Sequence, residues 1–269
     1  MLKTFGLEDA NPVRTPAATG VVLSLANCPT SAEKSLLMRN IPYQNAVGAL
    51  NHCAVMTRPD ISLAVQKVAQ FAANPRHEHW LAVKYILRYL KGTRNIVLTV
   101  GGKSASPPSF HAYCDSDFVN SPNHGRSVSG YAIILECGMF SWSAKKQTAT
   151  ALSTSEAEYY AGIHVGREIM WLRALTAEIG LPPDNPTCLY MDNTSTIRII
   201  TKPDEVTHRT KHIRLSYHWI RESVRDGHIS PVYVKSTENL ADIFMKLLPA
   251  ESHWRLMKEL GLDERANVS

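Results

Sequence analysis

The spacing of apolar residues divides the chain into a helical part and a mixed part. Between residues 43 and 91 apolar side chains recur every three or four positions, which is typical of amphipathic helices. Helices are predicted from Tyr43 to Met56, from Asp60 onward, and around Trp80 to Leu90, with Gly92 placed to cap the last of them. Nothing in this part has catalytic spacing, so we interpret it as a small helical domain.

From residue 110 the pattern changes to that of strands joined by short turns. Strands at 110–119, 129–137 and 139–143 predict an antiparallel meander, which a long helix from Ser153 to about Ile179 follows. The order then continues as strand, short helix, basic helix, strand and final helix, at 187–191, 194–201, 210–226, 229–234 and from Asn239. This order predicts an α/β (mixed α+β) domain, in which a five-stranded mixed sheet carries helices on its faces.

Composition indicates where the domains meet. Residues 101–109, GGKSASPPS, are rich in Gly, Ser and Pro, as linkers are. We therefore predict a helical domain over 1–100, a linker over 101–109, a second domain over 110–249, and a C-terminal helix and tail over 250–269.

Composition and charge exclude several classes of protein. Of the 269 residues, 44% are hydrophobic and 20% are charged, which is typical of a soluble globular protein. No apolar run approaches a membrane span, and MLKTFGLED lacks the core of a secretory signal, so we expect an intracellular protein without a membrane partner. The five cysteines form no CxxC or Cys/His cluster, which supports neither a disulfide framework nor a zinc site. The net charge of +5 suits a polyanionic partner.

Acidic residues stand in four strand-like or helix-start segments, where side chains from distant parts of the chain can meet. These segments are AYCDSDF with Asp115, LSTSEAEYYA with Glu156 and Glu158, LYMDN with Asp192, and ENLAD with Asp242. Four carboxylates at one place would repel each other unless a cation lies among them. Oxygen ligands in this number suit Mg²⁺ or Mn²⁺ rather than zinc. Two such ions can activate a water and stabilise the leaving oxygen in phosphodiester cleavage.

Each acid also has a purely structural alternative. Asp115 can be an exposed strand residue, Asp192 can cap the following helix, and Asp242 can complement a helix dipole. Glu156 fits a capping box with Ser153. For each acid taken singly, the structural interpretation is favoured. Their joint occurrence on this order of elements favours a metal site instead.

Only one of the two glutamates can face such a site, because residues two apart on a helix are turned by about 200° from each other. Glu158 begins an apolar stripe that continues through Ala161, Val165 and Ile169, whereas Glu156 lies over a more mixed row. We therefore predict that Glu158 faces the sheet.

Several runs between residues 110 and 249 occur in an order that is known from one family. They are YCDSDF, RSVSGYAI, SWSAKKQ, ALSTSEAEYYA, EIMWLRAL, YMDNTSTI, RTKHIRLSYHWIRE and NLADIFMK. With these runs the second domain resembles the ribonuclease H domain of copia-type LTR retrotransposon polyproteins. PYQNAVGALNHCAVMTRPDI and HEHWLAVKYILRYLKGT make the first domain similar to the end of reverse transcriptase and its connection to ribonuclease H in those polyproteins. The chain has no Tyr-x-Asp-Asp motif, so we expect no polymerase activity.

The resemblance implies a ribonuclease H-like fold and a metal-dependent endonuclease that hydrolyses the RNA strand of RNA–DNA hybrids. Its acidic quartet corresponds to Asp115, Glu158, Asp192 and Asp242, which hold two Mg²⁺ ions that Mn²⁺ can replace. The implied partners are the hybrid and the remaining reverse transcriptase subdomains. The missing polymerase core and the altered run LADIFMKLL leave one alternative open, a catalytically inactive nucleic-acid-binding remnant. The loop KSTE lacks the histidine that many cellular ribonucleases H carry there, which implies different or slower product release or water handling.

Basic residues are the candidates for contact with the phosphates of a hybrid. The stretch HRTKHIRLSYHWIRESVR has an apolar seam, and its other faces are basic. An ordinary solvated face is the alternative. The predicted nucleic-acid-binding residues are Lys211, His212, Arg214 and Arg221 of this stretch, Lys145 and Lys146 after the third strand, and Ser116 and Asn193 beside the acids.

Overall fold

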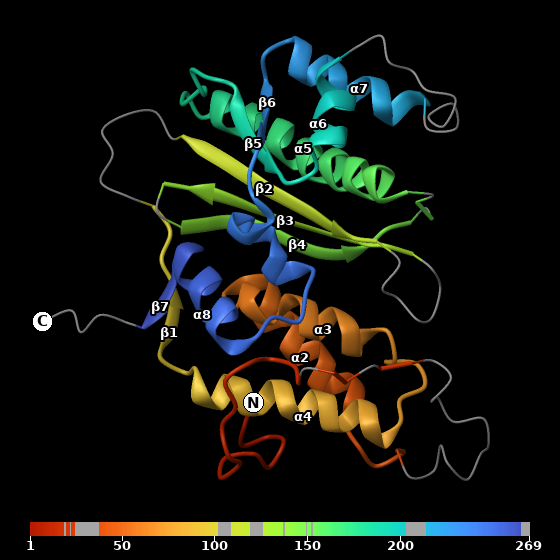
Figure 1. Ribbon diagram of the computed structural model, residues 1–269. Helices are drawn as coiled ribbons and strands as arrows, with labels where there is room; N and C mark the ends of the chain where they lie inside the picture. Colours follow the sequence, from red (N-terminus) through yellow and green to blue (C-terminus); the bar gives the residue numbers. More distant parts are fainter. Residues whose placement is uncertain are drawn as a thin grey trace, which may run out of the picture. The chain divides into compact units, whose positions relative to one another are not determined.

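The computed structural model describes residues 1–18, 20–21, 23–24, 38–101, 109–118, 126–136, 138–148, 150–151, 153–202 and 214–264, the side chains of 214–217 excepted. The described residues form two compact units (Figure 1). The first contains those up to Leu98 and those from Lys246 onward, and the second contains those from Thr99 to Met245. The predicted linker at 101–109 lies largely outside the described residues. Among the described residues, no helix combines the length and apolarity that crossing a membrane requires.

The first unit is mainly helical, as predicted. Its helices are α2 (Tyr43–Met56), the 3₁₀ helix η2 (Pro59–Ile61), α3 (Ser62–Ala69), α4 (His77–Gly92) and α8 (Ala250–Glu259). The predicted bounds of α2 are confirmed, whereas Gly92 is the last residue of α4 and Thr93 is its cap. Strands β1 (Ile96–Leu98) and β7 (Leu262–Glu264) pair antiparallel, so the described end of the chain contributes to this unit.

A buried polar cluster joins α8 to the helices that precede it in the first unit. The guanidinium of Arg58 donates to both carboxylate oxygens of Asp60, at 2.9 and 2.7 Å. Tyr89 donates its hydroxyl to Asp60 at 2.7 Å, and the same hydroxyl lies 3.1 Å from Nε2 of His253 in α8. Asp60, in the first turn of η2, therefore balances a buried cation, because the fold brings Arg58 and Tyr89 onto it.

The second unit is built on one mixed sheet. Its strands are β2 (Phe110–Asp117), β3 (Val128–Leu135), β4 (Gly138–Lys146), β5 (Thr187–Met191) and β6 (Ile229–Tyr233). The strand order is β4-β3-β2-β5-β6. The first three strands along the chain pair antiparallel, whereas β5 runs parallel to both β2 and β6. The predicted fold class, an α/β domain with a five-stranded mixed sheet and flanking helices, is confirmed.

Successive side chains of β2 point to opposite faces of the sheet, and one of these faces covers the apolar core. Phe110, Ala112 and Cys114 point into the apolar core that the long helix α5 (Thr154–Glu178) covers. Helices α6 (Thr194–Thr201) and α7 (Arg214–Arg225) add Ile200 and Ile220 to the same core (Figure 1).

On the other face of the sheet lies the 3₁₀ helix η5 (Leu240–Phe244), which packs against β2 and β3. The close approach requires glycine at position 130, opposite Asp115 in the ladder. A Cβ there would lie 2.8 Å from Cβ of Phe244 and against the sulfur of Met245.

The helix that is predicted to begin near Asn239 does begin there, but it is a short 3₁₀ helix and not the final helix of the chain. The chain forms a short 3₁₀ helix, η4 (Ser236–Glu238), then η5, and then α8 from Ala250. Asn239 does begin η5, since its side chain accepts from the N–H of Ala241 at 3.1 Å. Pro249 is the N-cap of α8, and a proline inside a continuous helix would remove a backbone hydrogen bond and kink or break it. Residues 210–213 of the predicted basic helix lie outside the described residues.

Candidate metal centre

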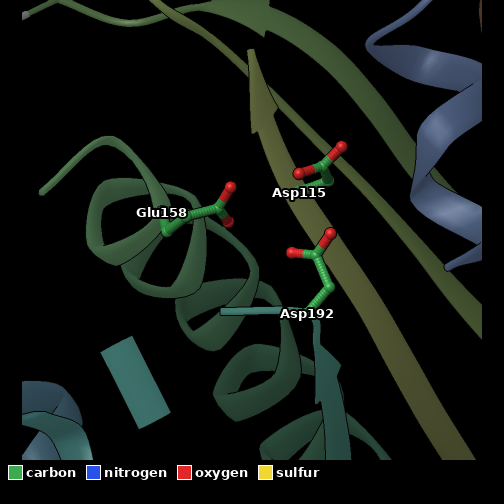
Figure 2. A group of neighbouring side chains, drawn as sticks. All are labelled: Asp115, Glu158 and Asp192. Atoms are coloured by element: carbon green, nitrogen blue, oxygen red, sulfur yellow. The ribbon is translucent and has the colours of Figure 1, made fainter. Parts of the chain in front are cut away.

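Three carboxylates from three distant segments meet in the second unit (Figure 2). Asp115 lies in β2, Glu158 in the second turn of α5, and Asp192 directly after β5. One carboxylate oxygen of each lies within 4.8 Å of the other two. Since β2 and β5 are adjacent parallel strands, and α5 packs against β2, the topology brings these positions to one place.

Two of the three acids are shielded from solvent, and one backbone N–H donates a hydrogen bond to both of them. Asp115 is 2% exposed and Glu158 is 3% exposed, whereas Asp192 is half-buried. The N–H of Ser116 donates to Oδ1 of Asp115 at 2.8 Å and to Oε1 of Glu158 at 3.2 Å. This N–H therefore holds the two carboxylates side by side.

Burial raises the pKa of Glu158 to about 9, and the negative charge of Asp115, followed by that of Asp192, contributes to the rise. The hydrogen bond from Ser116 opposes it. Without a cation, Glu158 is therefore protonated at neutral pH, because the ionised form is both desolvated and repelled.

The residues fit a hard divalent cation. Among the His, Cys, Asp and Glu side chains of the described residues, those that converge here offer carboxylate oxygens, which suit Mg²⁺ or Mn²⁺ better than zinc. Oε2 of Glu158 is buried, and no described residue hydrogen-bonds to it. A buried carboxylate oxygen of this kind needs a compensating charge or donor, which a bound cation would supply.

The structure separates the roles of the two glutamates in α5. Oγ of Ser153 accepts a hydrogen bond from the N–H of Glu156 at 3.2 Å, so Glu156 stands at the capped start of the helix. Glu158 is the one that enters the centre. Asp192 does not cap the next helix, because Asn193 accepts from the N–H of Thr196 at 3.0 Å and takes that position.

Asp242 is not among the acids that converge within 4.8 Å. It is half-buried in η5, which packs against the strand that carries Asp115. Its place as the fourth ligand stays a prediction.

The predicted nucleic-acid contacts on the sheet occupy different environments. Ser116 is buried, and its backbone N–H donates to the carboxylates of Asp115 and Glu158. Asn193 caps α6 with its side chain. Lys145 is exposed and Lys146 is half-buried at the end of β4. Across the sheet, through the facing residues of β3, Lys145 is in register with Ser116 and Lys146 with Asp117. Of these residues, Lys145 presents the most accessible cation.

The predicted contacts of the basic helix are only partly described. Arg214 begins α7. Arg221 donates from Nε to the carbonyl of Ile199 at 2.9 Å and so also joins α7 to α6. Lys211 and His212 lie outside the described residues.

Sequence reasoning missed three residues that hold the segments of the centre. Ser236 donates its hydroxyl to Oδ2 of Asp192 at 2.7 Å. Asn239 donates from Nδ2 to the carbonyl of Cys114 at 3.0 Å, and Gln147 donates to the carbonyl of Ala157 at 2.9 Å. Cys114 and Ala157 directly precede Asp115 and Glu158. The one signal in the sequence was the position of Asn239 before a helix; the other two contacts depend on tertiary structure.

Comparison with known proteins identifies the family. No protein-family model matches the chain. The chain is 41% identical over 260 residues (97% of its length) to the retrovirus-related Pol polyprotein from transposon TNT 1-94 of Nicotiana tabacum, covering 19% of that protein. It is 34% identical over 263 residues (97% of its length) to the Pol polyprotein from transposon RE2 of Arabidopsis thaliana, covering 17% of that protein. The chain thus spans about a fifth of the length of the curated relatives it matches.

Among solved structures, LC11-RNase H1 in complex with an RNA/DNA hybrid is similar, with a TM-score of 0.37 and 16% identity over 49% of this chain and 88% of that one. The assignment itself depends on the sequence matches, which extend over nearly the whole chain. The chain belongs to the retrovirus-related Pol polyproteins of copia-type retrotransposons.

Proposed function

We propose that the second unit is a ribonuclease H, an endonuclease that hydrolyses the RNA strand of RNA–DNA hybrids with two Mg²⁺ ions. The observation that carries the proposal is the convergence of Asp115, Glu158 and Asp192 within 4.8 Å on a ribonuclease H-like sheet. Membership in the Pol polyproteins supports it, because the reverse transcription of an RNA template leaves such hybrids.

In this proposal Asp115, Glu158 and Asp192 hold the ions, and Asp242 is the fourth ligand. Ions bound there would supply activation of a water and stabilisation of the leaving oxygen of the phosphodiester. The N–H of Ser116 keeps the carboxylates of Asp115 and Glu158 in place, so the site needs little rearrangement to bind a cation. Glu158 gives up its proton to become a ligand.

Contacts with the hybrid must come mainly from cations that meet its phosphates. Lys145 is exposed at the end of β4, in the row of the sheet that contains Ser116. We propose that Lys145 contacts the backbone of the hybrid and that the basic face of α7 extends this contact. The remaining reverse transcriptase subdomains are proposed partners of the first unit.

The test is cleavage of a labelled RNA–DNA hybrid by the full chain with Mg²⁺, compared with the Asp192→Asn variant and with DNA and RNA duplexes of the same sequence. We expect the wild type to cut only the RNA strand of the hybrid and the variant to be inactive. Absence of cleavage, or equal cleavage by both proteins, would contradict the proposal. Salt-dependent binding of the hybrid without turnover would instead support the inactive remnant.

A further inference from the structure

The turn that follows β6 is held beside the end of β5. The N–H of Val234 donates to the carbonyl of Met191 at 2.9 Å, which extends the pairing of the two strands by one residue beyond β6. The next residues form η4 (Ser236–Glu238). Since Asp192 directly follows Met191, this pairing places η4 next to Asp192.

Within η4, the hydroxyl of Ser236 donates to Oδ2 of Asp192 at 2.7 Å. A hydroxyl that donates to a carboxylate at this distance forms a strong, charge-assisted hydrogen bond. The bond fixes the rotation of the Asp192 carboxylate, while Oδ1 and the remaining lone pair of Oδ2 stay available to a cation.

Asp192 differs from the other two acids in how it is held. Asp115 and Glu158 are buried and share the N–H of Ser116. Asp192 is half-buried at the end of its strand, where solvent competes for the carboxylate. An orienting donor therefore matters more at Asp192 than at the two buried acids.

The position of the turn is fixed from its far end as well. Asn239, which is fully buried, follows η4 and donates to the carbonyl of Cys114 in β2 at 3.0 Å. The turn is thus attached to β5 through Val234 and to β2 through Asn239, and these two strands carry or immediately precede Asp115 and Asp192. Ser236 is exposed, yet its backbone is anchored on both sides.

We propose that Ser236 is a positioning residue, whose hydroxyl holds the Asp192 carboxylate in the orientation that binds a divalent cation. Carboxylates that ligate metals are commonly hydrogen-bonded by such partners, and the loss of one weakens metal binding. The inference rests on the proposed metal site, and it does not depend on which nucleic acid the protein cuts.

The experiment measures Mn²⁺ binding to the full chain by the loss of the free-ion signal in electron paramagnetic resonance. Wild type is compared with Ser236→Ala, which removes the hydroxyl, and with Ser236→Thr, which keeps it. We expect Ser236→Ala to weaken Mn²⁺ binding by about 10-fold. This is the lower end of the loss in metal affinity that follows removal of a hydrogen-bond partner of a metal ligand, because the bond from Ser236 is exposed. Ser236→Thr should bind nearly as the wild type does.

Thr201→Ala is the matched control, because its exposed hydroxyl donates to the backbone carbonyl of Ile197 and not to a carboxylate. It should leave Mn²⁺ affinity unchanged. Thermal unfolding of each variant separates positioning from folding. An unchanged unfolding midpoint with weaker Mn²⁺ binding in Ser236→Ala alone supports the inference.

Equal Mn²⁺ affinity of wild type and Ser236→Ala would overturn the inference, and so would equal weakening in the Ala and Thr variants. A wild type that binds no Mn²⁺ would overturn it together with the metal site. If Mn²⁺ binding responds as expected but no hybrid is cut, the proposed nuclease activity fails while the role of Ser236 stands. If the hybrid is cut and Ser236→Ala binds Mn²⁺ normally, only the role of Ser236 fails.

Discussion

The N–H of Ser116 in β2 donates a hydrogen bond to Oε1 of Glu158 in α5 at 3.2 Å. The same N–H donates to Asp115 at 2.8 Å, so one backbone group joins a strand acid to a helix acid. Two carboxylates held this closely in a buried place destabilise the metal-free protein unless one is protonated. The raised pKa of Glu158 means that a proton relieves this repulsion at neutral pH, and a bound cation would replace that proton.

The two glutamates of α5 should respond differently to neutral substitution. Glu158→Gln removes a ligand and should lower hybrid cleavage by at least about 100-fold, the upper end of what even indirect partners of a metal cost. Glu156→Gln leaves the centre unchanged and should mainly lower stability, by roughly 0.5 kcal/mol, since Glu156 favours the helix start electrostatically. Cleavage rates and thermal unfolding of both variants test the division. Equal loss of activity in two folded variants would refute it.

Cation binding should be strongly pH-dependent. Because burial and neighbouring acids raise the pKa of Glu158 to about 9, the metal-free protein holds a proton there at neutral pH. A cation must displace that proton, so affinity should rise by up to about 10-fold per pH unit below pH 9. Titration of Mn²⁺ at several pH values, with proton release measured in buffers of different ionisation enthalpy, checks this. An affinity that stays constant between pH 6.5 and 8.5 would argue against a protonated Glu158.

A methyl group at position 130 should disturb the packing of η5 on the sheet. In Gly130→Ala the new Cβ would lie 2.8 Å from Cβ of Phe244, so η5 must shift. We expect a loss of roughly 1–3 kcal/mol in the free energy of unfolding, typical of overpacking. Gly48→Ala in α2 is the control, since nothing lies within 4 Å of its added Cβ. Chemical denaturation measures both, and unchanged stability in Gly130→Ala would show that η5 is not closely packed there.

The stability of the first unit should fall as the solution becomes acidic. Burial lowers the pKa of His253 to about 4, from the ordinary value of 6.5. Between these values the unfolded chain binds a proton that the folded protein does not, so stability is fully present above pH 6.5 and declines as pH falls through 4. The slope from this residue is at most about 1.4 kcal/mol per pH unit.

Thermal unfolding of wild type and His253→Gln between pH 4 and 7 tests this. The variant should show a weaker pH dependence, although some should persist because burial also lowers the pKa of His79 in the same unit. Identical pH profiles would mean that His253 is not buried as neutral imidazole beside Tyr89.

The local pattern of the sequence predicted most elements of the second unit. Thr187–Met191 and Thr194–Thr201 have the predicted bounds, because strand and helix periodicity there is uninterrupted and Asn193 marks the helix start. The choice of Glu158 over Glu156 followed from the same kind of pattern together with the family resemblance, and the apolar stripe that Glu158 begins does pack into the core. Local spacing suffices where a residue's direction is set by its own helix or strand.

Other features depended on contacts between distant segments, which no local pattern contains. The sequence predicted neither the pairing of β1 with β7 nor the cluster of Arg58, Asp60, Tyr89 and His253, since these join residues far apart in the chain. The predicted helix at Asn239 became a 3₁₀ turn.

At the candidate metal centre, the sequence by itself determined which acids stand at strand ends and helix starts. Only the tertiary structure decided that Asp115, Glu158 and Asp192 converge and that Ser236 and the N–H of Ser116 orient them. The reason is physical: side-chain chemistry is encoded residue by residue, whereas a distance of a few ångströms between three segments is fixed by the packing of the whole sheet and its helices.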